Sequence, residues 1–163
     1  VIAINFIVDG GEQSVPRRHI MRFEGHSPLG KIFVSNVEAA QNASTSKVCT
    51  PQNVEHGIKA VVTVARGAFL NHDEAFLPNY LYIPAEDIPE FQLAPYFGKS
   101  YDFIDRNLLR TNVSRAVFEV LVHCMAGISR SVTIVAAYIV RKFKKTSEEA
   151  LGQIRRKRSI VNT

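Results

Sequence analysis

A nine-residue segment in the second half of the chain, residues 123–131, combines residue types that could bind a phosphate group and attack it. It reads His-Cys-Met-Ala-Gly-Ile-Ser-Arg-Ser, which leaves five residues between Cys124 and Arg130. Five residues can curl so that successive backbone N–H groups point inward and hold an anion. Gly127 permits backbone angles that a side chain would forbid, and the planar guanidinium of Arg130 can bind two phosphate oxygens at once. The residues expected to bind the phosphate group are Met125, Ala126, Gly127, Ile128, Ser129 and Arg130.

Cys124 is the expected nucleophile of this segment. The helix predicted to follow Arg130 points its positive end at the loop, and a helix N-terminus and a nearby arginine both favour the reactive thiolate form. Ser131 can hydrogen-bond the sulfur and stabilise it as a leaving group. His123 and Cys124 are neighbours on a strand, so their side chains point to opposite faces, which argues against a Cys–His protease pair. We expect His123 to support the loop from beneath by bonding backbone groups; an inert buried cysteine is the alternative for Cys124.

Short apolar segments that alternate with amphipathic ones indicate the elements that position this loop. Residues 116–122 give the strongest strand signal, because β-branched and apolar residues dominate them. Thr146 and Glu149 form a capping box that opens a last helix ending near residue 158. Such alternation predicts an α/β fold with a central, mostly parallel sheet flanked by helices, in which ligands bind beyond the carboxyl ends of the strands. The remaining expected strands are residues 31–35, 59–65 and 80–83, and the remaining expected helices are residues 36–47 and 131–145 and a helix between residues 89 and 110 that has Pro95 in its first turn.

Composition limits the class of protein. A chain of 163 residues suits one domain, and no apolar run reaches the ~20 residues that span a bilayer. The net charge of +5 comes largely from residues 141–145 and 155–158, which are either solvated helix surfaces or an attraction for anions. These basic residues are not interleaved with a stacking set of aromatic residues, so we expect no nucleic-acid partner. Two cysteines make neither a disulfide framework nor a zinc site, which favours a reducing cytoplasmic or nuclear location and no metal or cofactor.

Residues 122–131 resemble the signature of the dual-specificity branch of the protein tyrosine phosphatases. The Ala-Gly-Ile-Ser-Arg-Ser run is most similar to that of the MAP-kinase phosphatases and the small atypical enzymes, and the resemblance covers roughly residues 30–161. It implies a single-domain protein tyrosine phosphatase-like fold, with residues 1–30 as an N-terminal extension and residues 31–163 as the catalytic domain. Thr63 departs from the family pattern, in which asparagine is common at this position.

A phosphatase also needs a proton donor for the leaving oxygen, and a carboxyl group is the usual one. Asp87 follows the expected strand at residues 80–83 in a loop that could overhang the site. The resemblance implies an acid in such a loop, just before a proline, and Asp87 in Ala-Glu-Asp-Ile-Pro matches that position. Glu86 and Asp73 remain alternatives.

The resemblance implies hydrolysis through a phosphocysteine intermediate, with Cys124, Asp87, Arg130 and Ser131 as the catalytic residues. The expected partner is a phosphoprotein substrate, with a MAP kinase as a candidate. No aromatic loop of the kind that builds a deep phosphotyrosine pocket is visible, which favours action on phosphoserine and phosphothreonine as well as phosphotyrosine. The alternatives are a non-protein substrate (a phosphoinositide, an RNA end or a glycan) and a phosphoprotein-binding scaffold. Cys49 is expected to be an ordinary cysteine, with a redox pairing to Cys124 as the alternative.

Overall fold

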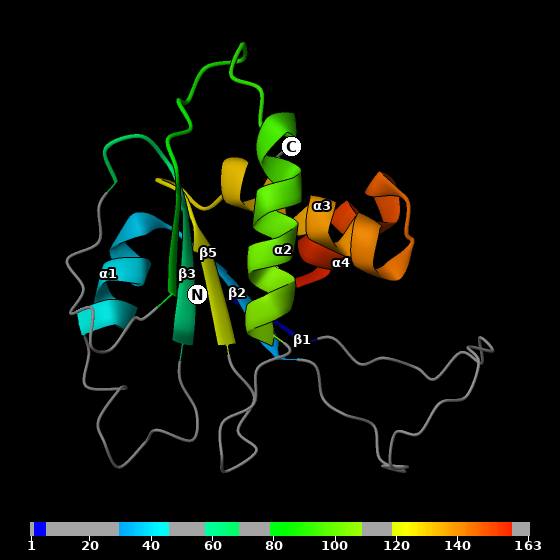
Figure 1. Cartoon of the computed structure of the whole chain (residues 1–163), viewed down its shortest axis with the longest axis horizontal. Coiled ribbons are helices and arrows are strands. Elements are labelled where there is room, and N and C mark those ends of the chain that lie inside the picture. Colours follow the sequence, from blue (N-terminus) through cyan, green and yellow to red (C-terminus); the bar gives the residue numbers. More distant parts are fainter. Residues whose placement is uncertain (1, 6–29, 46–57, 69–78, 109–118, 158–163) are drawn as a thin grey trace.

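The molecule is built on a five-stranded sheet, shown in Figure 1. The computed structural model describes residues 2–5, 30–45, 58–68, 79–108 and 119–157. Its strands pair in the order β1-β2-β5-β3-β4, with β1 antiparallel to β2 and all other pairs parallel. The prediction of an α/β fold with a mostly parallel sheet is therefore confirmed. The strands are β1 (Ile2–Asn5), β2 (Lys31–Ser35), β3 (Ile58–Val64), β4 (Asn79–Ile83) and β5 (Glu119–His123).

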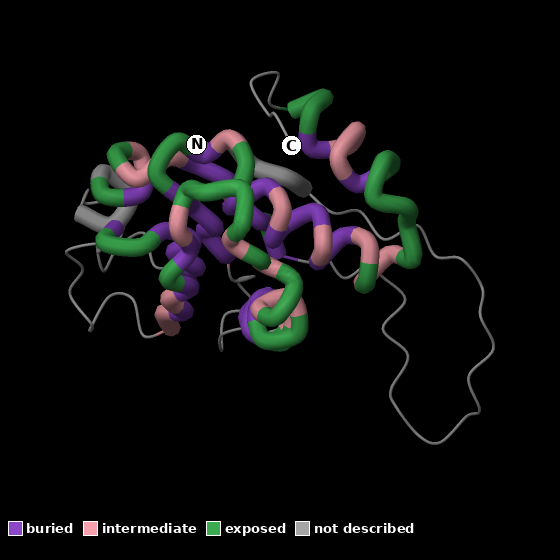
Figure 2. Tube along the Cα trace, turned by 90° about the horizontal axis from the view of Figure 1, so that it is seen from above, coloured by how far each residue is buried: buried purple, intermediate pink, exposed green. Residues whose placement is uncertain are grey.

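Helices cover both faces of this sheet. The helix α1 (Val37–Thr45) packs on one face, where Ala40 meets Val61 and Leu121. Against the other face lie α2 (Phe97–Leu108), which follows the short 3-10 helix η3 (Ala94–Tyr96), and α3 (Arg130–Phe143). The last helix, α4 (Ser147–Lys157), packs on α3. Figure 2 shows the result, with buried positions along the central strands and exposed positions on the outer turns of the helices.

The period of two along each strand separates the two faces of the core. Val34, Val62 and Val122 are register partners that belong to the larger cluster beneath α2 and α3. Their strand neighbours Val61 and Leu121 are paired with each other and belong to the smaller cluster beneath α1. Sheets buried on both faces are typical of parallel α/β folds.

Most expected elements lie within two or three residues of the observed ones. The helix α3 ends at Phe143 rather than at the expected residue 145, because Lys144 adopts a left-handed backbone with φ of 54°. The capping box forms as expected: Glu149 N–H donates to the Thr146 hydroxyl at 3.2 Å, and Thr146 N–H donates to the Glu149 carboxylate at 2.8 Å. Part of the expected strand at residues 116–122 and most of the N-terminal extension lie outside the described residues, although Ile2–Asn5 forms the edge strand β1.

The parallel strands β2, β3, β4 and β5 all end at the same edge of the sheet. The segments that follow β3, β4 and β5 begin at this edge, and they include residues 65–68, 84–93 and 124–129. None of the helices in the described ranges combines the length and the apolar character needed to cross a membrane.

Candidate active site

Cys124 lies directly after β5, at the base of the loop that leads into α3. Its sulfur is 3.3 Å from the Ser131 Oγ atom and accepts a hydrogen bond from the Gly127 N–H at 3.2 Å. Both the cysteine and Ser131 are buried, with exposed fractions of 1% and 0%. A backbone N–H and a hydroxyl aimed at a shielded sulfur stabilise its negative charge more strongly than they would in water. The loop therefore shields the Cys124 sulfur from water and places two polar groups, the Gly127 N–H and the Ser131 hydroxyl, beside it.

Gly127 lets the loop lie close to the start of α1. Its φ is +69°, and a Cβ atom placed there would lie 2.6 Å from the backbone C and O atoms of Ser35 and 2.7 Å from the Asn36 nitrogen. Backbone atoms cannot move aside as a flexible side chain would, so only glycine fits this approach. The Met125 carbonyl accepts a hydrogen bond from the Val37 N–H at 3.1 Å, which fixes the loop from the same side.

Arg130 is the first residue of α3, and its guanidinium contacts the segment that follows β4. One terminal nitrogen donates to the Ala85 carbonyl oxygen at 3.1 Å, and the other forms an ion pair with the Asp87 carboxylate at 2.9 Å. The Arg130 side chain is 10% exposed, whereas that of Asp87 is 79% exposed. The arginine is thus held in place by a backbone group, and its carboxylate partner is free to exchange with solvent or with a substrate.

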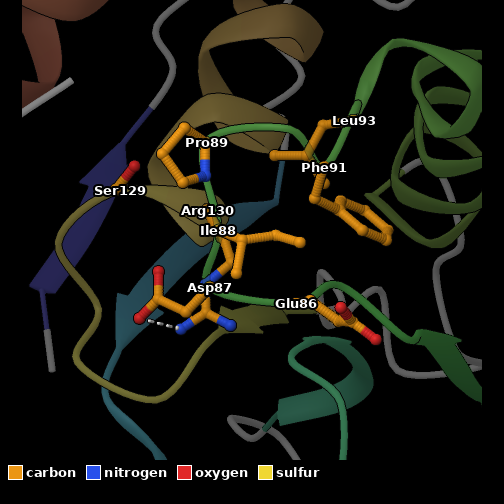
Figure 3. Close-up of a pocket in the computed structure, with 8 residues that line it drawn as sticks. All are labelled: Glu86, Asp87, Ile88, Pro89, Phe91, Leu93, Ser129 and Arg130. Carbon is orange, nitrogen blue, oxygen red and sulfur yellow. Dashed lines mark ion pairs between the residues drawn. The ribbon is translucent and has the colours of Figure 1, made fainter.

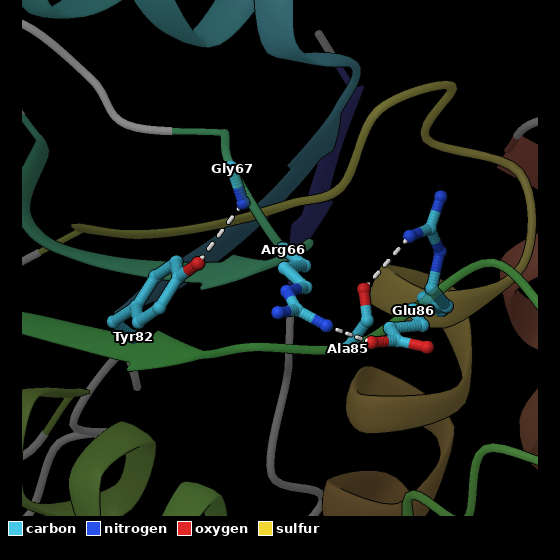
Figure 4. A network of polar contacts seen from close by, with 6 residues as sticks. Arg66, Gly67, Tyr82, Ala85 and Glu86 are labelled. Carbon is cyan, nitrogen blue, oxygen red and sulfur yellow. Dashed lines mark hydrogen bonds and ion pairs between the residues drawn. The ribbon is translucent and has the colours of Figure 1, made fainter.

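The segment that follows β4, which contains Asp87, is held by contacts with the residues that follow β3, as Figure 4 shows. Arg66 N–H donates to the Ala85 carbonyl oxygen at 2.9 Å, and the Arg66 guanidinium forms an ion pair with Glu86. The Tyr82 hydroxyl oxygen accepts a hydrogen bond from the Gly67 N–H at 3.1 Å. Of the three carboxyl groups considered as the acid, Asp87 contacts Arg130 of the phosphate-binding loop and Glu86 contacts Arg66, whereas Asp73 lies outside the described residues.

His123 lies on the opposite face from Cys124, in register with Thr63 and Ser35. Its Nε2 atom is 2.6 Å from the Thr63 hydroxyl, which also accepts a hydrogen bond from the Tyr80 hydroxyl at 2.8 Å. Burial lowers the pKa of His123 to about 4, so the ring is neutral at neutral pH. An interaction with the Cys124 backbone raises the pKa of His123 and so opposes part of this fall. The His123 Nδ1 atom has no hydrogen-bond partner of ordinary geometry among the described residues. The expected contact of His123 with backbone groups is represented by the Cys124 backbone, and the Thr63 side chain is a partner that the sequence did not indicate.

The structure brings together most of the site residues that the sequence predicted. Cys124, Ser131, Arg130 and Asp87 surround one loop, and residues 125–129 form that loop. Sequence reasoning missed the contributions of Arg66 and the Ala85 carbonyl, and it recorded Thr63 only as a departure from a family pattern. A buried threonine in register with a histidine was the available signal for Thr63. Asp73 and Cys49 lie outside the described residues, so their relation to the site stays open.

The same segments match a known family. Residues 40–163 match the model of the dual specificity phosphatase catalytic domain. The chain belongs to this family. It is 34% identical over 131 residues to dual specificity protein phosphatase 1 of Arabidopsis thaliana and 36% identical over 106 residues to dual specificity protein phosphatase 1 of Homo sapiens. These alignments cover 80% and 65% of this chain, but only 59% and 27% of the two relatives.

A solved structure gives the same answer for the fold. The human tyrosine phosphatase-like serine/threonine/tyrosine-interacting protein matches with a TM-score of 0.64 and 28% identity, over 80% of this chain and 82% of that one. The expectation of a dual-specificity phosphatase of single-domain fold is confirmed at the level of the family.

Proposed function

We propose that this chain is a cysteine-dependent protein phosphatase that hydrolyses phosphotyrosine and phosphoserine or phosphothreonine esters. The observation that carries the proposal is the environment of Cys124, whose buried sulfur lies 3.3 Å from the Ser131 hydroxyl and 3.2 Å from the Gly127 N–H. A sulfur with two such donors is suited both to attack as a thiolate and to leave as one.

In the first step, the phosphate group enters the loop and replaces Asp87 as the partner of Arg130. The guanidinium then holds two equatorial oxygens, with the loop N–H groups around the others. The Cys124 thiolate attacks phosphorus in line with the ester oxygen, and the P–O bond to that oxygen breaks. Asp87, released from Arg130, takes up a proton from solvent and transfers it to the leaving oxygen. The products are an alcohol or phenol and a phosphocysteine.

In the second step, water replaces the leaving group beside the Asp87 carboxylate. Asp87 takes one proton from this water, and the water oxygen attacks phosphorus while the S–P bond breaks. The electron pair of that bond returns to Cys124, where the Ser131 hydroxyl and the Gly127 N–H stabilise the thiolate. Inorganic phosphate is released, and Asp87 again holds the proton needed for the next cycle.

The test compares leaving groups of different basicity. We would measure steady-state hydrolysis of p-nitrophenyl phosphate and of phenyl phosphate by the wild type, Cys124→Ser and Asp87→Asn. Cys124→Ser is expected to abolish turnover. Asp87→Asn is expected to lower kcat on phenyl phosphate by about 10²–10⁴-fold and on p-nitrophenyl phosphate by much less, because a good leaving group needs no proton.

Glu90→Gln is the matched control, since Glu90 is an exposed carboxylate of the same segment. It should keep wild-type kcat on both esters. Turnover by Cys124→Ser would refute the covalent mechanism, and equal losses on both esters in Asp87→Asn would refute the acid role of Asp87.

Two other functions compete with this proposal. A scaffold that binds phosphoproteins without hydrolysing them has some support from the name of the human relative, which describes an interacting protein. A binder has no need of a buried cysteine sulfur with two polar groups beside it, so the Cys124 environment favours an enzyme. A phosphatase of phosphoinositides, RNA ends or glycans would use the same loop; a panel of phosphopeptides and these esters separates the two, and higher kcat/KM on a non-protein ester would overturn the protein assignment.

We propose a MAP kinase as the first phosphoprotein to test, because the Ala-Gly-Ile-Ser-Arg-Ser run is most similar to that of the MAP-kinase phosphatases. Release of phosphate from both the threonine and the tyrosine of an activated kinase supports this choice, and failure on the intact kinase would exclude it. A cytoplasmic or nuclear location goes with the proposal, since a catalytic thiolate requires a reducing compartment.

A further inference from the structure

A cavity of about 390 Å³ adjoins the candidate active site on the side of Arg130 and Asp87. Figure 3 shows it, with the Arg130–Asp87 ion pair at one end and apolar side chains around the rest. The apolar part consists of Ile88, Pro89, Phe91 and Leu93, and the remaining lining residues are Glu86 and Ser129. We call this cavity the acid-loop groove. Its size lies within the range of pockets that bind small ligands or single side chains.

The direction of the reaction places the substrate over this groove. The leaving oxygen must lie opposite the Cys124 sulfur and within hydrogen-bond reach of the Asp87 carboxyl. The rest of the substrate therefore leaves the phosphate site past Asp87. The acid-loop groove begins beside Asp87, because Asp87 and Arg130 line the groove and also belong to the candidate active site.

Exposure of apolar side chains also marks this part of the surface. Among the described residues, the large apolar side chains that stay exposed are Ile88 and Met125, at 48% each. One belongs to the acid-loop groove and the other to the phosphate-binding loop. Both residues lie in segments that border the candidate active site, and Ile88 also lines the groove.

The groove has a fixed shape. The Phe91 N–H donates to the Ile88 carbonyl at 3.2 Å, which closes a turn across the apolar residues. The Phe91 ring stacks on that of Tyr96 with 6.0 Å between centroids, and the Tyr96 N–H donates to the Leu93 carbonyl at 2.9 Å. A preformed groove binds its ligand without the entropic cost of ordering a loop.

The charges around the groove select against an anionic occupant. Arg130 is the sole cation among the lining residues, and in the bound state it is committed to the substrate phosphate. Glu86 also lines the groove, and its carboxylate is paired with Arg66. A second phosphate group or a polyphosphorylated headgroup would find no free cation here, whereas an uncharged apolar group would bury Ile88 and Phe91.

From these observations, and resting on the proposed phosphatase function, we propose that the acid-loop groove binds an aliphatic or aromatic side chain within two residues of the phosphorylated residue of a protein substrate. Burial of one such side chain against Ile88 and its neighbours supplies about a tenfold gain in kcat/KM over a small polar residue. A second phosphorylated residue at the same position lowers kcat/KM.

The experiment uses phosphotyrosine peptides of one length in which one flanking position at a time, two on each side, is Phe, Leu, Ser or phosphoserine. For the wild type we expect kcat/KM for Phe to exceed that for Ser by about tenfold at one position at least, with phosphoserine poorest. Ile88→Ser should reduce the Phe-to-Ser ratio to about twofold. Glu90→Gln, an exposed change in the same segment but outside the groove lining, should keep the wild-type ratio.

A second variant makes the test independent of any loss of folding. Ile88→Phe partly fills the groove, so it should invert the preference toward small flanking residues such as Ala. Equal kcat/KM for all flanking residues, or a preference that Ile88→Ser leaves intact, would overturn this inference while leaving the phosphatase function standing. Hydrolysis of a phosphoinositide in phosphatidylcholine vesicles with no phosphate release from any peptide would overturn the proposed protein phosphatase and this inference together.

Discussion

Replacing Thr63 by valine removes a hydroxyl that joins two other side chains beneath the phosphate-binding loop. Valine keeps the shape of threonine, so the change creates no cavity and isolates the polar contribution. Thr63 contacts His123 Nε2 at 2.6 Å and the Tyr80 hydroxyl at 2.8 Å. Burial raises the pKa of Tyr80, so its hydroxyl stays protonated and acts as the donor to Thr63.

The magnitude follows from what each partner loses. His123 is fully buried and its Nδ1 already lacks a hydrogen-bond partner, so the substitution leaves both ring nitrogens without one. An unsatisfied buried group costs about 1–3 kcal/mol. Tyr80 is half-buried and can turn to water, so its lost hydrogen bond costs about 0.5–1 kcal/mol. We expect the free energy of unfolding to fall by about 3 kcal/mol in total, a large part of the 5–15 kcal/mol that stabilises an ordinary domain.

Urea unfolding followed by circular dichroism measures this loss. With a slope of about 2 kcal/mol per molar urea, the midpoint should fall by about 1.5 M. Thr63→Ser keeps the hydroxyl and should lose only about 1 kcal/mol, for its buried methyl group. Tyr80→Phe should lose about 1 kcal/mol alone and nothing further when added to Thr63→Val. A Thr63→Val midpoint within 0.3 M of the wild type, or an equally large fall in Thr63→Ser, would refute the reasoning.

Other substitutions and conditions test the remaining parts of the structure. Gly127→Ala should lower kcat/KM by more than about 100-fold and destabilise the chain, because its Cβ would lie 2.6 Å from the Ser35 backbone. Gly152→Ala, in a helix where the added Cβ would make only an ordinary contact of 3.8 Å with the Arg156 side chain, should be neutral or stabilising, and an active Gly127→Ala would contradict the predicted clash. For His123, whose pKa falls from 6.5 in the unfolded chain to about 4 in the folded one, the unfolded state binds the extra proton as the pH drops through this window. The free energy of unfolding should therefore lose about 3 kcal/mol between pH 6.5 and pH 4 from this group, and His123→Gln should lack that part of the slope; identical slopes would show that His123 is not the group responsible. Thr146→Ala removes the hydroxyl of the capping box and should lower the thermal midpoint by about 2–4 °C, whereas the exposed change Lys145→Ala should not.

Features carried by short stretches of sequence could be predicted, and features that join distant stretches could not. The capping box of Thr146 and Glu149 spans four residues, and the loop from Cys124 to Arg130 spans seven, so pattern alone was sufficient to find them. The end of α3 was expected two residues too late, because apolar periodicity does not reveal the left-handed backbone of Lys144.

The supporting contacts of the site depend instead on which strands become neighbours. Thr63 and His123 are 60 residues apart in sequence and meet only because β3 pairs with β5 in parallel register. The ion pair of Arg66 with Glu86 likewise requires β3 beside β4. Local sequence carries no information about strand order, so the partner of His123 and the role of Arg66 emerge only from the fold.

The Ala85 carbonyl has a consequence for how this site responds to mutation. One main-chain oxygen accepts from the Arg66 N–H at 2.9 Å and from the Arg130 guanidinium at 3.1 Å, so the joint between the two loops is made by an atom that every amino acid possesses. Alanine scanning would miss the acceptor, because position 85 is already alanine and the oxygen belongs to the main chain; only Arg130→Ala would affect the joint, by removing one donor. The position of this acceptor depends on the course of the backbone and not on which residue occupies position 85. Detecting it takes a change in the main chain itself, such as Arg66→Pro, which deletes one donor, or an ester in place of the peptide bond at residue 66.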